Sequence, residues 1–380
     1  MKLKVATILG TRPEIIRLSR VMALLNECTD HLIIHTGQNY DYELNEVFFT
    51  DLDVTKPSYF LGVDTSSLGA TVGGILLETE KVLAKEKPDA VLILGDTNSA
   101  ISSYIARRMK IPIYHMEAGN RCFDRNVPEE TNRKMVDHLA DFNLVYTEHA
   151  RRNLLSEGLH PRRIYLTGSP MREVLNFYLE GIDRSNILTE LSLEADKYFL
   201  VSIHREENVD NSENLTELVT ALNRIADLFD LPVVVSTHPR TRKRLDMLTD
   251  VTTDERVHWL KPFGFYDYNR LQKSAKCVVS DSGTIVEESS MLGFSAVTPR
   301  FSIERPEAID TGAIMACGYK AADIIRCISA TLNQKSVYPT GYASFVPVDY
   351  QITNTAQRVV NLILATAKLS NEWDGIRSSE

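Results

Sequence analysis

Acidic side chains are concentrated in one stretch of this chain, from His115 to Arg133. The stretch reads HMEAGNRCFDRNVPEETNR and follows an apolar, strand-like run. Its acids alternate with arginines: the acids are Glu117, Asp124, Glu129 and Glu130, and the arginines are Arg121, Arg125 and Arg133. Acids so close together repel one another, so this density indicates acid/base chemistry or cation binding. A solvated loop of ion pairs is the alternative interpretation.

A second acidic position favours chemistry over simple ion pairing. Asp96 lies in the sequence GDTNS, just after the apolar run Val91–Leu94. We take Asp96, Glu117 and Glu129 as the candidate acid/base groups. Burial among other acids raises carboxyl pKa values towards neutrality, so that such groups can exchange protons. The acids could instead bind Mg²⁺, but these three lack the close spacing expected of a metal motif, so we favour acid/base chemistry.

The turn Gly10–Glu14, with the sequence GTRPE, follows the first apolar run. A threonine cap and a proline in the first helical turn would direct backbone N–H groups and the Arg12 guanidinium at an anion. An ordinary strand-to-helix turn is the alternative. The turn lacks GxGxxG and the chain has no GxxxxGK[ST] sequence, so neither a dinucleotide cofactor nor a P-loop is predicted.

A similar turn, Asp281–Thr284 (DSGT), occurs late in the chain between an apolar run and an expected helix. Ser282 and Gly283 at a helix N-terminus could donate hydrogen bonds to a diphosphate. Glu288, about one turn further on, could accept hydrogen bonds from ribose hydroxyls. An ordinary capped helix is the alternative, but the pairing with the Arg12 turn favours a bound nucleotide.

Basic side chains follow two further expected strands. His204 and Arg205 begin the sequence HREEN, and an imidazole beside a guanidinium suits phosphate charge. His238 has a similar position in a weaker context, and we interpret it as structural. Arg305, in PRFSIERPE, could complete the pocket, with surface ion pairing as its alternative.

Short apolar runs alternate with amphipathic helical patterns, such as the stripe of apolar residues between Leu68 and Leu83. Strands that are apolar throughout, separated by helices, indicate a parallel sheet covered on both faces. Such a pattern occurs twice, which predicts two doubly wound α/β domains facing a cleft at the carboxyl ends of their strands. The expected strands are Val5–Leu9, Leu32–His35, Val91–Leu94, Ile113–Met116, Asn143–Tyr146 and Ile164–Leu166, then Phe199–Ile203, Val233–Ser236, Val257–Leu260, Cys277–Ser280 and Ala296–Thr298.

A length of 380 residues also suggests two domains. The charged helical stretch from Arg172 to Lys197 separates the two patterns. We therefore expect an N-terminal Rossmann-like domain with the catalytic acids at 1–171 and a C-terminal Rossmann-like, nucleotide-binding domain at 172–354. A closing helix and tail would follow at 355–380.

Composition narrows the possible partners. The net charge is −9 and the basic residues are scattered, which argues against a nucleic-acid partner. Five widely spaced cysteines without a CxxC pair suggest reduced thiols in a cytoplasm. The N-terminal MKLKVATILG runs into a strand and is too short for a signal peptide, and no apolar run approaches membrane-spanning length. We expect a cytoplasmic protein with no membrane partner.

Taken together and in order, the motifs resemble the non-hydrolysing UDP-N-acetylglucosamine 2-epimerase family. The resemblance runs nearly end to end through GTRPE, GDT, HxEAG, PEExNR, HRxE, DSG with a glutamate pair, and ERPE. It implies two Rossmann-like domains as in B-type glycosyltransferases, a homodimer, and inversion of C2 in a UDP-linked 2-acetamido sugar. It also implies that no redox cofactor and no metal is used.

At matching positions, Asp96, Glu117 and Glu129 resemble the catalytic acids, and we count His204 with them. His204 also resembles a UDP-binding residue. The other residues that resemble the UDP-sugar site are Arg12, Arg205, Ser282, Gly283, Glu288 and Arg305, with Glu288 on the ribose.

The implied chemistry agrees with a constraint on the substrate. The C2–H bond of such a sugar has no neighbouring carbonyl to acidify it, so simple deprotonation is implausible. Oxidation would need a nicotinamide site that the sequence lacks. Elimination of UDP across C1 and C2, followed by re-addition with the proton on the other face, would invert C2 through a glycal.

The chain departs from the family pattern at several places. Residues 120–124 read NRCFD where the family has a Leu-Arg-Thr-Gly-Asp type sequence, Thr284 replaces a glycine, and Arg17 replaces a lysine. The segment Gly37–Tyr42 replaces a Gln-His pair that belongs to the activator site in bacterial members. Activation by UDP-N-acetylglucosamine is therefore not expected.

The combination TGQNYDYELN, HMEAGNRCFD, SIHREEN, KPFGFYDYN and SDSGT resembles one branch of the family. That branch converts UDP-N-acetyl-L-talosamine to UDP-N-acetyl-L-fucosamine, a precursor of capsule and O-antigen. Phe123 could contact the 6-methyl group of such a sugar or could be a local packing residue. The alternatives are a UDP-N-acetylglucosamine 2-epimerase that gives UDP-N-acetylmannosamine, a glycosyltransferase, and a non-catalytic nucleotide-sugar sensor.

Overall fold

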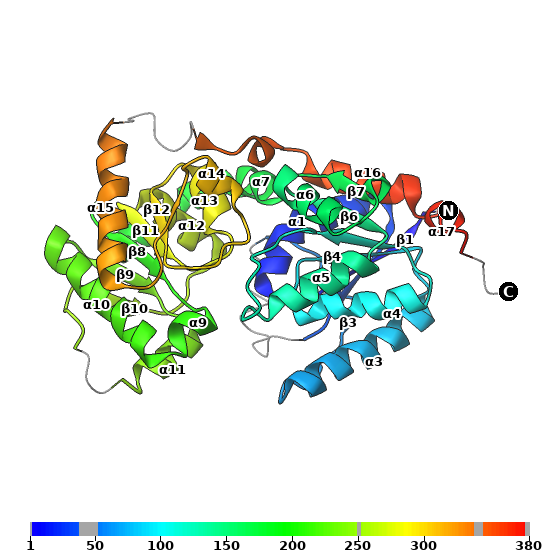
Figure 1. Cartoon of the computed structure of the whole chain (residues 1–380), viewed down its shortest axis with the longest axis horizontal. Helices are drawn as coiled ribbons and strands as arrows, with labels where there is room; N and C mark the ends of the chain where they lie inside the picture. The colour runs from blue at the N-terminus through cyan, green and yellow to red at the C-terminus, as the bar shows by residue number, and fades with distance from the viewer. Residues whose placement is uncertain (1, 38–51, 249–251, 338–344, 377–380) are drawn as a thin grey trace. The chain divides into compact units, whose positions relative to one another are not determined.

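The computed structural model of the chain describes residues 2–37, 52–248, 252–337 and 345–376. The chain divides into two compact units (Figure 1). Met1–Asn176 together with Val348–Glu380 form the first unit, and Phe177–Pro347 form the second. The C-terminal segment thus returns to the N-terminal unit, where helix α16 (Thr355–Thr366) packs against α1 (Arg12–Cys28).

The first unit is built on a seven-stranded sheet in the order β3-β2-β1-β4-β5-β6-β7, and every neighbouring pair is parallel. Its strands are β1 (Lys4–Leu9), β2 (Asp30–His35), β3 (Tyr59–Phe60), β4 (Ala90–Leu94), β5 (Ile113–Met116), β6 (Phe142–Val145) and β7 (Ile164–Leu166). Strands β4, β5 and β6 are buried along their whole length, as expected for a sheet covered by helices on both faces.

Helices α3 (Leu68–Glu86), α4 (Ser103–Arg108) and α5 (Glu129–Leu139) share one apolar cluster with strands β1, β2, β4 and β5. They therefore cover one face of the first sheet, while α6 (Glu148–Ser156) packs through a separate cluster near β6 and β7. The remaining elements of this unit are α1, α16, α7 (Met171–Arg184, which continues into the second unit), α17 (Ser370–Trp373), and the 3-10 turns η1 (Asn98–Ser102), η2 (Pro161–Arg163) and η4 (Val348–Gln351).

The second unit has a six-stranded parallel sheet in the order β10-β9-β8-β11-β12-β13. Its strands are β8 (Phe199–Ser202), β9 (Val233–Ser236), β10 (Val257–Leu260), β11 (Cys277–Ser280), β12 (Ala296–Thr298) and β13 (Met315–Ala316). Its helices are α8 (Ile187–Glu190), α9 (Glu206–Val209), α10 (Ser212–Phe229), α11 (Pro239–Leu245), α12 (Phe265–Ser274), α13 (Ile285–Leu292), α14 (Glu307–Asp310) and α15 (Ala321–Val337).

Side chains of strand β8 alternate between two apolar clusters. Phe199 and Val201 belong to the cluster that includes α10 and α15, whereas Leu200 belongs to the cluster that includes α12 and α13. Because successive side chains of a strand point to opposite faces, this sheet is also covered on both sides. The predicted fold class, an α/β chain with two doubly wound parallel sheets, is confirmed.

The strand order reverses at one place in each sheet, and the predicted motifs lie there. In the first sheet the reversal falls between β1 and β4, which the GTRPE and GDT sequences follow. In the second sheet it falls between β8 and β11, which the HREEN and DSGT sequences follow. Ligands of doubly wound sheets bind at the carboxyl ends of the strands near such a reversal. Each unit therefore presents a candidate half-site.

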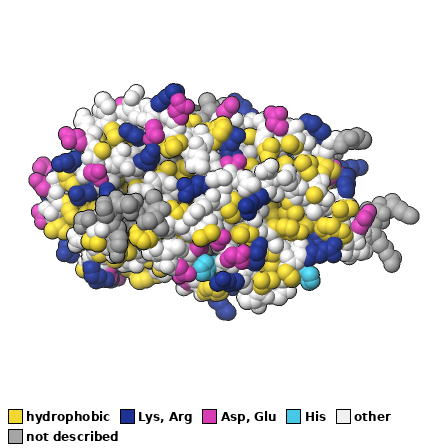
Figure 2. All heavy atoms as spheres, turned by 90° about the horizontal axis from the view of Figure 1, so that it is seen from above, with side chains coloured by type: hydrophobic (Ala, Val, Ile, Leu, Met, Phe, Trp, Pro, Cys, Tyr) yellow, Lys and Arg dark blue, Asp and Glu magenta, His cyan; other side chains and the backbone are white. Residues whose placement is uncertain are grey.

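The surface carries charges of both signs. Figure 2 shows basic and acidic side chains scattered over the face that it draws. All five cysteines are free thiols. Within the ranges that the structure describes, no helix is long and apolar enough to span a membrane.

Gly10 tests the packing at the place where the strand order of the first sheet reverses, and Gly73 serves as its control. A Cβ atom on Gly10 would lie 2.1 Å from Thr36 Oγ1 and 2.2 Å from Ser99 Oγ, whereas a Cβ atom on Gly73 in α3 would meet nothing within 4 Å. We expect Gly10→Ala to lower the free energy of unfolding by about 1–3 kcal/mol through overpacking. Gly73→Ala should raise it by about 0.5–1 kcal/mol through helix propensity. Urea unfolding measures both, and equal stabilities of the two variants would contradict this packing.

Candidate active site

Glu117 is the first residue after β5, and its carboxylate faces the end of β4. Its backbone has a φ of 65°, an unfavourable conformation for a non-glycine residue. A Cβ atom on Gly95 would lie 3.1 Å from Glu117 Oε2, so a glycine is needed for this approach. Arg17 Nη1 of α1 contacts Glu117 Oε2, and both side chains are largely buried, with 12% and 11% exposed. The Glu117 carboxylate is thus oriented by a guanidinium group.

Asp96 is held by a different arginine. Arg133 of α5 donates to Asp96 Oδ2 from Nε at 2.9 Å and from Nη2 at 2.6 Å. The Asn132 amide donates to the backbone carbonyl of Asp96 at 2.9 Å. Because Asp96 follows Gly95, the structure brings Asp96 and Glu117 to the same edge of the first sheet, each with its own arginine.

The two glutamates that begin α5 differ in environment. Glu129 is exposed, and Glu130 is buried. Arg133 Nη1 donates to Glu130 Oε2 at 2.7 Å, and the backbone N–H of Cys122 donates to the same oxygen at 3.2 Å. Burial alone would raise the pKa of Glu130, but these hydrogen bonds and the Arg133 charge together lower it below the usual range.

Arg121 anchors the loop that joins β5 to α5. Its side chain is fully buried and donates to both carboxylate oxygens of Glu157 at 2.7 Å and to Asp137 Oδ2 at 2.7 Å. His115 lies between Asp137 Oδ1, 2.9 Å from Nδ1, and the Gly95 carbonyl, 2.8 Å from Nε2. Arg121 therefore forms ion pairs, but they lie inside the protein and not in the solvated loop of the alternative interpretation.

Sequence reasoning missed Glu14. This carboxylate is buried in the turn after β1 and accepts hydrogen bonds from the backbone N–H groups of Gly10 and Thr11 at 2.9 and 2.7 Å. Its other oxygen accepts from Thr97 Oγ1 at 2.9 Å, in the loop after β4. Burial raises the pKa of Glu14, and its hydrogen bonds oppose that rise. The Thr-x-x-Glu spacing of a capping box was the signal that could have found this residue.

A buried carboxylate also organises the half-site of the second unit. Asp281, directly after β11, is fully buried and accepts hydrogen bonds from three groups that follow β8. The donors are the backbone N–H groups of His204 and Arg205 at 3.1 and 3.0 Å and Asn208 Nδ2 at 2.8 Å. The HREEN turn is thus fixed against the DSGT turn. This role of Asp281 could not be predicted, because its partners lie more than seventy positions away in the chain.

Arg205 lies against the turn that begins α13. Its Nε donates to the Asp281 carbonyl at 3.0 Å, and its Nη2 lies 3.4 Å from Glu304 Oε1. A Cβ atom on Gly283 would lie 3.6 Å from Arg205 Nη2, and Ser282 Oγ lies 3.0 Å from Thr284 Oγ1. One polar edge of the second sheet is therefore formed by Arg205, Ser282 and Gly283. These residues follow strands of the sheet, and residues that follow parallel strands are expected to lie at the same edge.

The side chains of Glu288 and Arg305 each interact with a buried polar residue of the second unit. Gln272 of α12 is fully buried and donates to Glu288 Oε2 at 2.6 Å. Arg305 is also buried, with Nη1 3.1 Å from Glu287 Oε1 on α13. The guanidinium of Arg305 therefore fixes α13 from within the unit, which sequence position alone did not reveal.

The predicted residues are divided between the two units. Arg12, Asp96, Glu117 and Glu129 belong to the first, and the second contains His204, Arg205, Ser282, Gly283, Glu288 and Arg305. Residues 38–42 of the segment that replaces the Gln-His pair lie outside the described residues.

Phe123 lies in the part of the loop that departs from the family pattern. Its side chain is 75% exposed and its φ is 56°. Phe123 is therefore not a core residue of the first unit.

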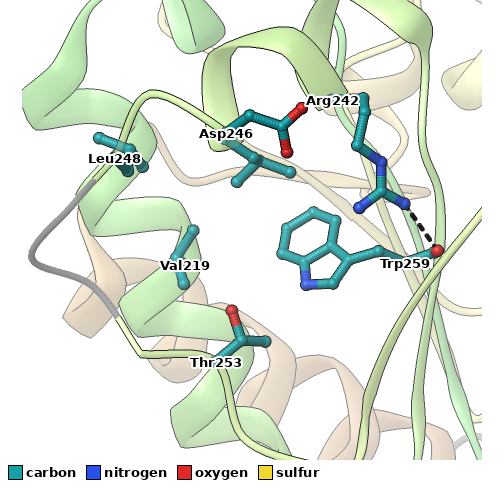
Figure 3. A pocket seen from close by; sticks show the side chains of 7 residues that line it. Val219, Arg242, Asp246, Leu248, Thr253 and Trp259 are labelled. Atoms are coloured by element: carbon teal, nitrogen blue, oxygen red, sulfur yellow. Dashed lines mark hydrogen bonds between the residues drawn. The ribbon is translucent and has the colours of Figure 1, made fainter.

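Two cavities lined by described residues contain none of the predicted residues. One of about 160 Å³ in the second unit is lined by Arg242, Asp246, Trp259 and neighbouring apolar residues, with Arg242 Nη2 2.8 Å from the Trp259 carbonyl (Figure 3). The other, of about 520 Å³, lies between β7 and α16 of the first unit. In the described ranges, no three His, Cys, Asp or Glu side chains are grouped as metal ligands.

Comparison with known proteins gives the class and then the family. The structure of a UDP-N-acetylglucosamine 2-epimerase from Rickettsia bellii matches with a TM-score of 0.90 and 41% identity over 98% of this chain and 99% of that one. The Methanocaldococcus jannaschii UDP-GlcNAc 2-epimerase in complex with UDP-GlcNAc and UDP matches with a TM-score of 0.87 and 34% identity, over 96% of this chain and 100% of that one. The chain thus has the two-sheet, glycosyltransferase-B-like fold of nucleotide-sugar epimerases.

The family model described as UDP-N-acetylglucosamine 2-epimerase matches residues 23–364. A UDP-2,3-diacetamido-2,3-dideoxy-D-glucuronate 2-epimerase of Pseudomonas aeruginosa is 34% identical over 347 residues, 89% of this chain and 95% of that protein. The chain belongs to the UDP-N-acetylglucosamine 2-epimerase family, whose members are isomerases of nucleotide sugars. The family resemblance and the prediction of an isomerase are confirmed.

Proposed function

We propose that this UDP-sugar 2-epimerase acts on a UDP-linked 2-acetamido-6-deoxy sugar and converts UDP-N-acetyl-L-talosamine to UDP-N-acetyl-L-fucosamine for capsule or O-antigen synthesis. One observation carries the chemistry: Asp96 and Glu117 lie at one sheet edge, and each is oriented by a separate arginine. Carboxylates fixed in this way can move a proton to or from a carbon without reorganising. The relatives named above differ in the sugar that their names give, so family membership leaves the substrate open.

The first chemical step is an elimination. A carboxylate among Asp96, Glu117 and Glu129 takes the proton from C2, the C–H electron pair forms the C1–C2 double bond, and the C1–O bond breaks. UDP leaves with the electron pair of the C1–O bond, and a 2-acetamidoglycal remains. In the second step a proton is delivered to the opposite face of C2, and a β-phosphate oxygen of UDP attacks C1. Atoms and charges balance without a redox cofactor or a metal.

The second unit supplies groups suited to the departing UDP. His204 is half-exposed and its Nδ1 lies 3.3 Å from the buried Asp281 Oδ1, so its imidazole is oriented to donate to the leaving phosphate. Arg205, Ser282 and Gly283 can bind the diphosphate charge. We assign Arg12 to UDP-sugar binding, Glu288 to the ribose hydroxyls, and Arg305 to the support of the nucleotide site in the second unit.

The substrate branch is supported by the loop that departs from the family pattern. The exposed ring of Phe123 lies two residues from Arg121, the anchor of the loop that carries Glu117. An exposed aromatic ring can cover a methyl group, which a 6-deoxy sugar has in place of a hydroxymethyl group. UDP-N-acetylglucosamine, giving UDP-N-acetylmannosamine, is the second candidate substrate, because both matched structures are epimerases named for it.

We further propose that the protein is a cytoplasmic homodimer. The large apolar side chains exposed on the neighbouring helices α3, α4 and α5 include Leu77, Tyr104 and Met135. These helices lie along one side of the first unit (Figure 1). Contact between two copies through this face would remove the three side chains from water.

Substitution of the acids tests their roles. We expect Asp96→Asn, Glu117→Gln and Glu129→Gln each to lower kcat by about 10²–10⁴-fold, because each removes a proton-transfer group. UDP should still bind within about threefold of the wild-type affinity, since a carboxamide conserves shape. Steady-state kinetics and calorimetric titration with UDP measure the two effects. Wild-type rates in all three variants would remove the acid/base assignment.

Incubation of each UDP-sugar in D₂O tests the reaction and the substrate. We expect UDP-N-acetyl-L-talosamine to give the C2 epimer with one deuterium at C2 and without any acceptor, as observed by NMR. UDP-N-acetylglucosamine should react at least about tenfold less efficiently, since its C6 is a hydroxymethyl group and not a methyl group. Faster reaction of UDP-N-acetylglucosamine would favour the second candidate, and a requirement for an acceptor would indicate a glycosyltransferase.

A further inference from the structure

The buried Glu130 has no role in the reaction as described, although it contacts the arginine that holds Asp96. We propose that Glu130 is a positioning residue for C2 epimerisation, which fixes Arg133 and thereby sets the orientation and charge environment of Asp96. This inference rests on the proposed function, because it assumes that Asp96 handles a proton in the reaction.

The guanidinium of Arg133 is shared between the two acids. Nε and Nη2 donate to Asp96 Oδ2 at 2.9 and 2.6 Å, and Nη1 donates to Glu130 Oε2 at 2.7 Å. A guanidinium is planar and rigid, so the bond at Nη1 fixes the plane in which the other two nitrogens meet Asp96. Glu130 thus controls the geometry at Asp96 through Arg133.

The exposed fraction of the three side chains increases from Glu130 through Arg133 to Asp96. Glu130 is 5% exposed, Arg133 is 6% exposed and Asp96 is 25% exposed. Glu130 and Arg133 are therefore set in the protein interior, where charge interactions are strong, and only Asp96 is accessible to a reacting group.

Glu130 carries a negative charge at neutral pH. Burial would raise its pKa, but hydrogen bonds from Cys122 and Arg133 and the charge of Arg133 lower it below the usual range. Lys134 Nζ, on the same helix, lies 3.6 Å from Glu130 Oε1. Among the described residues, charged groups near this cluster include Asp96 at the end of β4 and the Glu117–Arg17 pair beside Gly95.

Cys122 connects Glu130 to the loop that distinguishes this chain. Its backbone N–H and its Sγ atom lie 3.2 and 3.3 Å from Glu130 Oε2, and its Sγ lies 3.6 Å from Arg133 Nη1. Because residues 120–124 depart from the family pattern, the support behind Asp96 is built partly from a side chain that the common pattern lacks.

A cation between two anions divides its attraction between them. Without the charge of Glu130, the full charge of Arg133 acts on Asp96, and the repulsion between the two carboxylates disappears. Both changes favour the ionised form of Asp96. In the direction in which Asp96 acts as the base, the acidic limb of the pH–rate profile should therefore move to lower pH.

The chain offers a matched control in α6. Glu148 and Arg151 have the same i,i+3 spacing in the first turn of a helix and an N–O distance of 2.8 Å. Their side chains are 41% and 33% exposed, in contrast with the buried pair of α5. Glu148→Gln thus removes the same charge from the same local arrangement, away from the predicted acids.

The test compares the pH dependence of kcat and KM for wild type, Glu130→Gln and Glu148→Gln with the UDP-sugar that wild type epimerises. For Glu130→Gln we expect kcat to fall about tenfold and KM to stay within about twofold. The acidic limb of the kcat–pH profile should move to lower pH by about 0.5–1 pH unit. Glu148→Gln should match wild type. An unmoved limb in Glu130→Gln, or an equal shift in Glu148→Gln, would overturn the proposal.

Glu130→Asp provides a variant that keeps the charge but shortens the side chain. It should lower kcat through the lost orientation and leave the acidic limb where it is. A downward shift of about 0.5–1 pH unit in this variant would show that the charge of Glu130 is not the cause and would overturn the proposal. This outcome does not depend on whether Glu130→Gln folds.

A second measurement separates this proposal from the proposed function. The carboxyl ¹³C signal of Asp96, assigned by its loss in Asp96→Asn, can be followed against pH in wild type and Glu130→Gln. A titration midpoint that moves to lower pH supports the role of Glu130 even if wild type epimerises none of the UDP-sugars, in which case only the proposed function fails. An unmoved midpoint in an active enzyme removes the role of Glu130 alone.

Discussion

Buried pairing of arginine with carboxylate is the constraint on which the first half-site depends. An unpaired charge at the end of a buried sheet would cost several kcal/mol, so each charge there needs a partner in the folded chain. The charge of Arg121 is neutralised by Asp137 and Glu157. Arg133 forms an ion pair with Asp96. Arg17 forms an ion pair with Glu117. These ion pairs offset the repulsion between the acidic side chains and thereby order the loop. The carboxylates of Asp96 and Glu117 are left oriented at the sheet edge.

The second unit uses a buried carboxylate in a related way. Asp281 accepts backbone N–H groups from the HREEN turn, so it fixes His204 and Arg205 beside the start of α13. In both units the polar groups follow the strands on either side of the place where strand order reverses. The doubly wound sheet thus explains why residues distant in sequence contribute to one half-site.

The sequence predicted the strands well because each is an apolar run bounded by polar residues. The two-residue edge strands β3 and β13 were missed, since two residues carry too little pattern. Asp96 and Glu117 could be selected because they follow strands, but their arginine partners could not, as Arg17 lies 100 positions from Glu117. Helical periodicity could have shown that Glu130, Arg133 and Val136 face inwards together while Glu129 does not.

Cleavage of the bond between C1 and the UDP oxygen is the central claim of the proposed mechanism. The direct test uses a UDP-sugar substrate with ¹⁸O in the bridge between C1 and the β-phosphorus. If UDP departs and returns, its β-phosphate can rotate in the site, and recovered nucleotide sugar should carry ¹⁸O in non-bridging positions, detectable by ³¹P NMR. Epimerised product with all of the ¹⁸O still in the bridge would contradict the elimination mechanism.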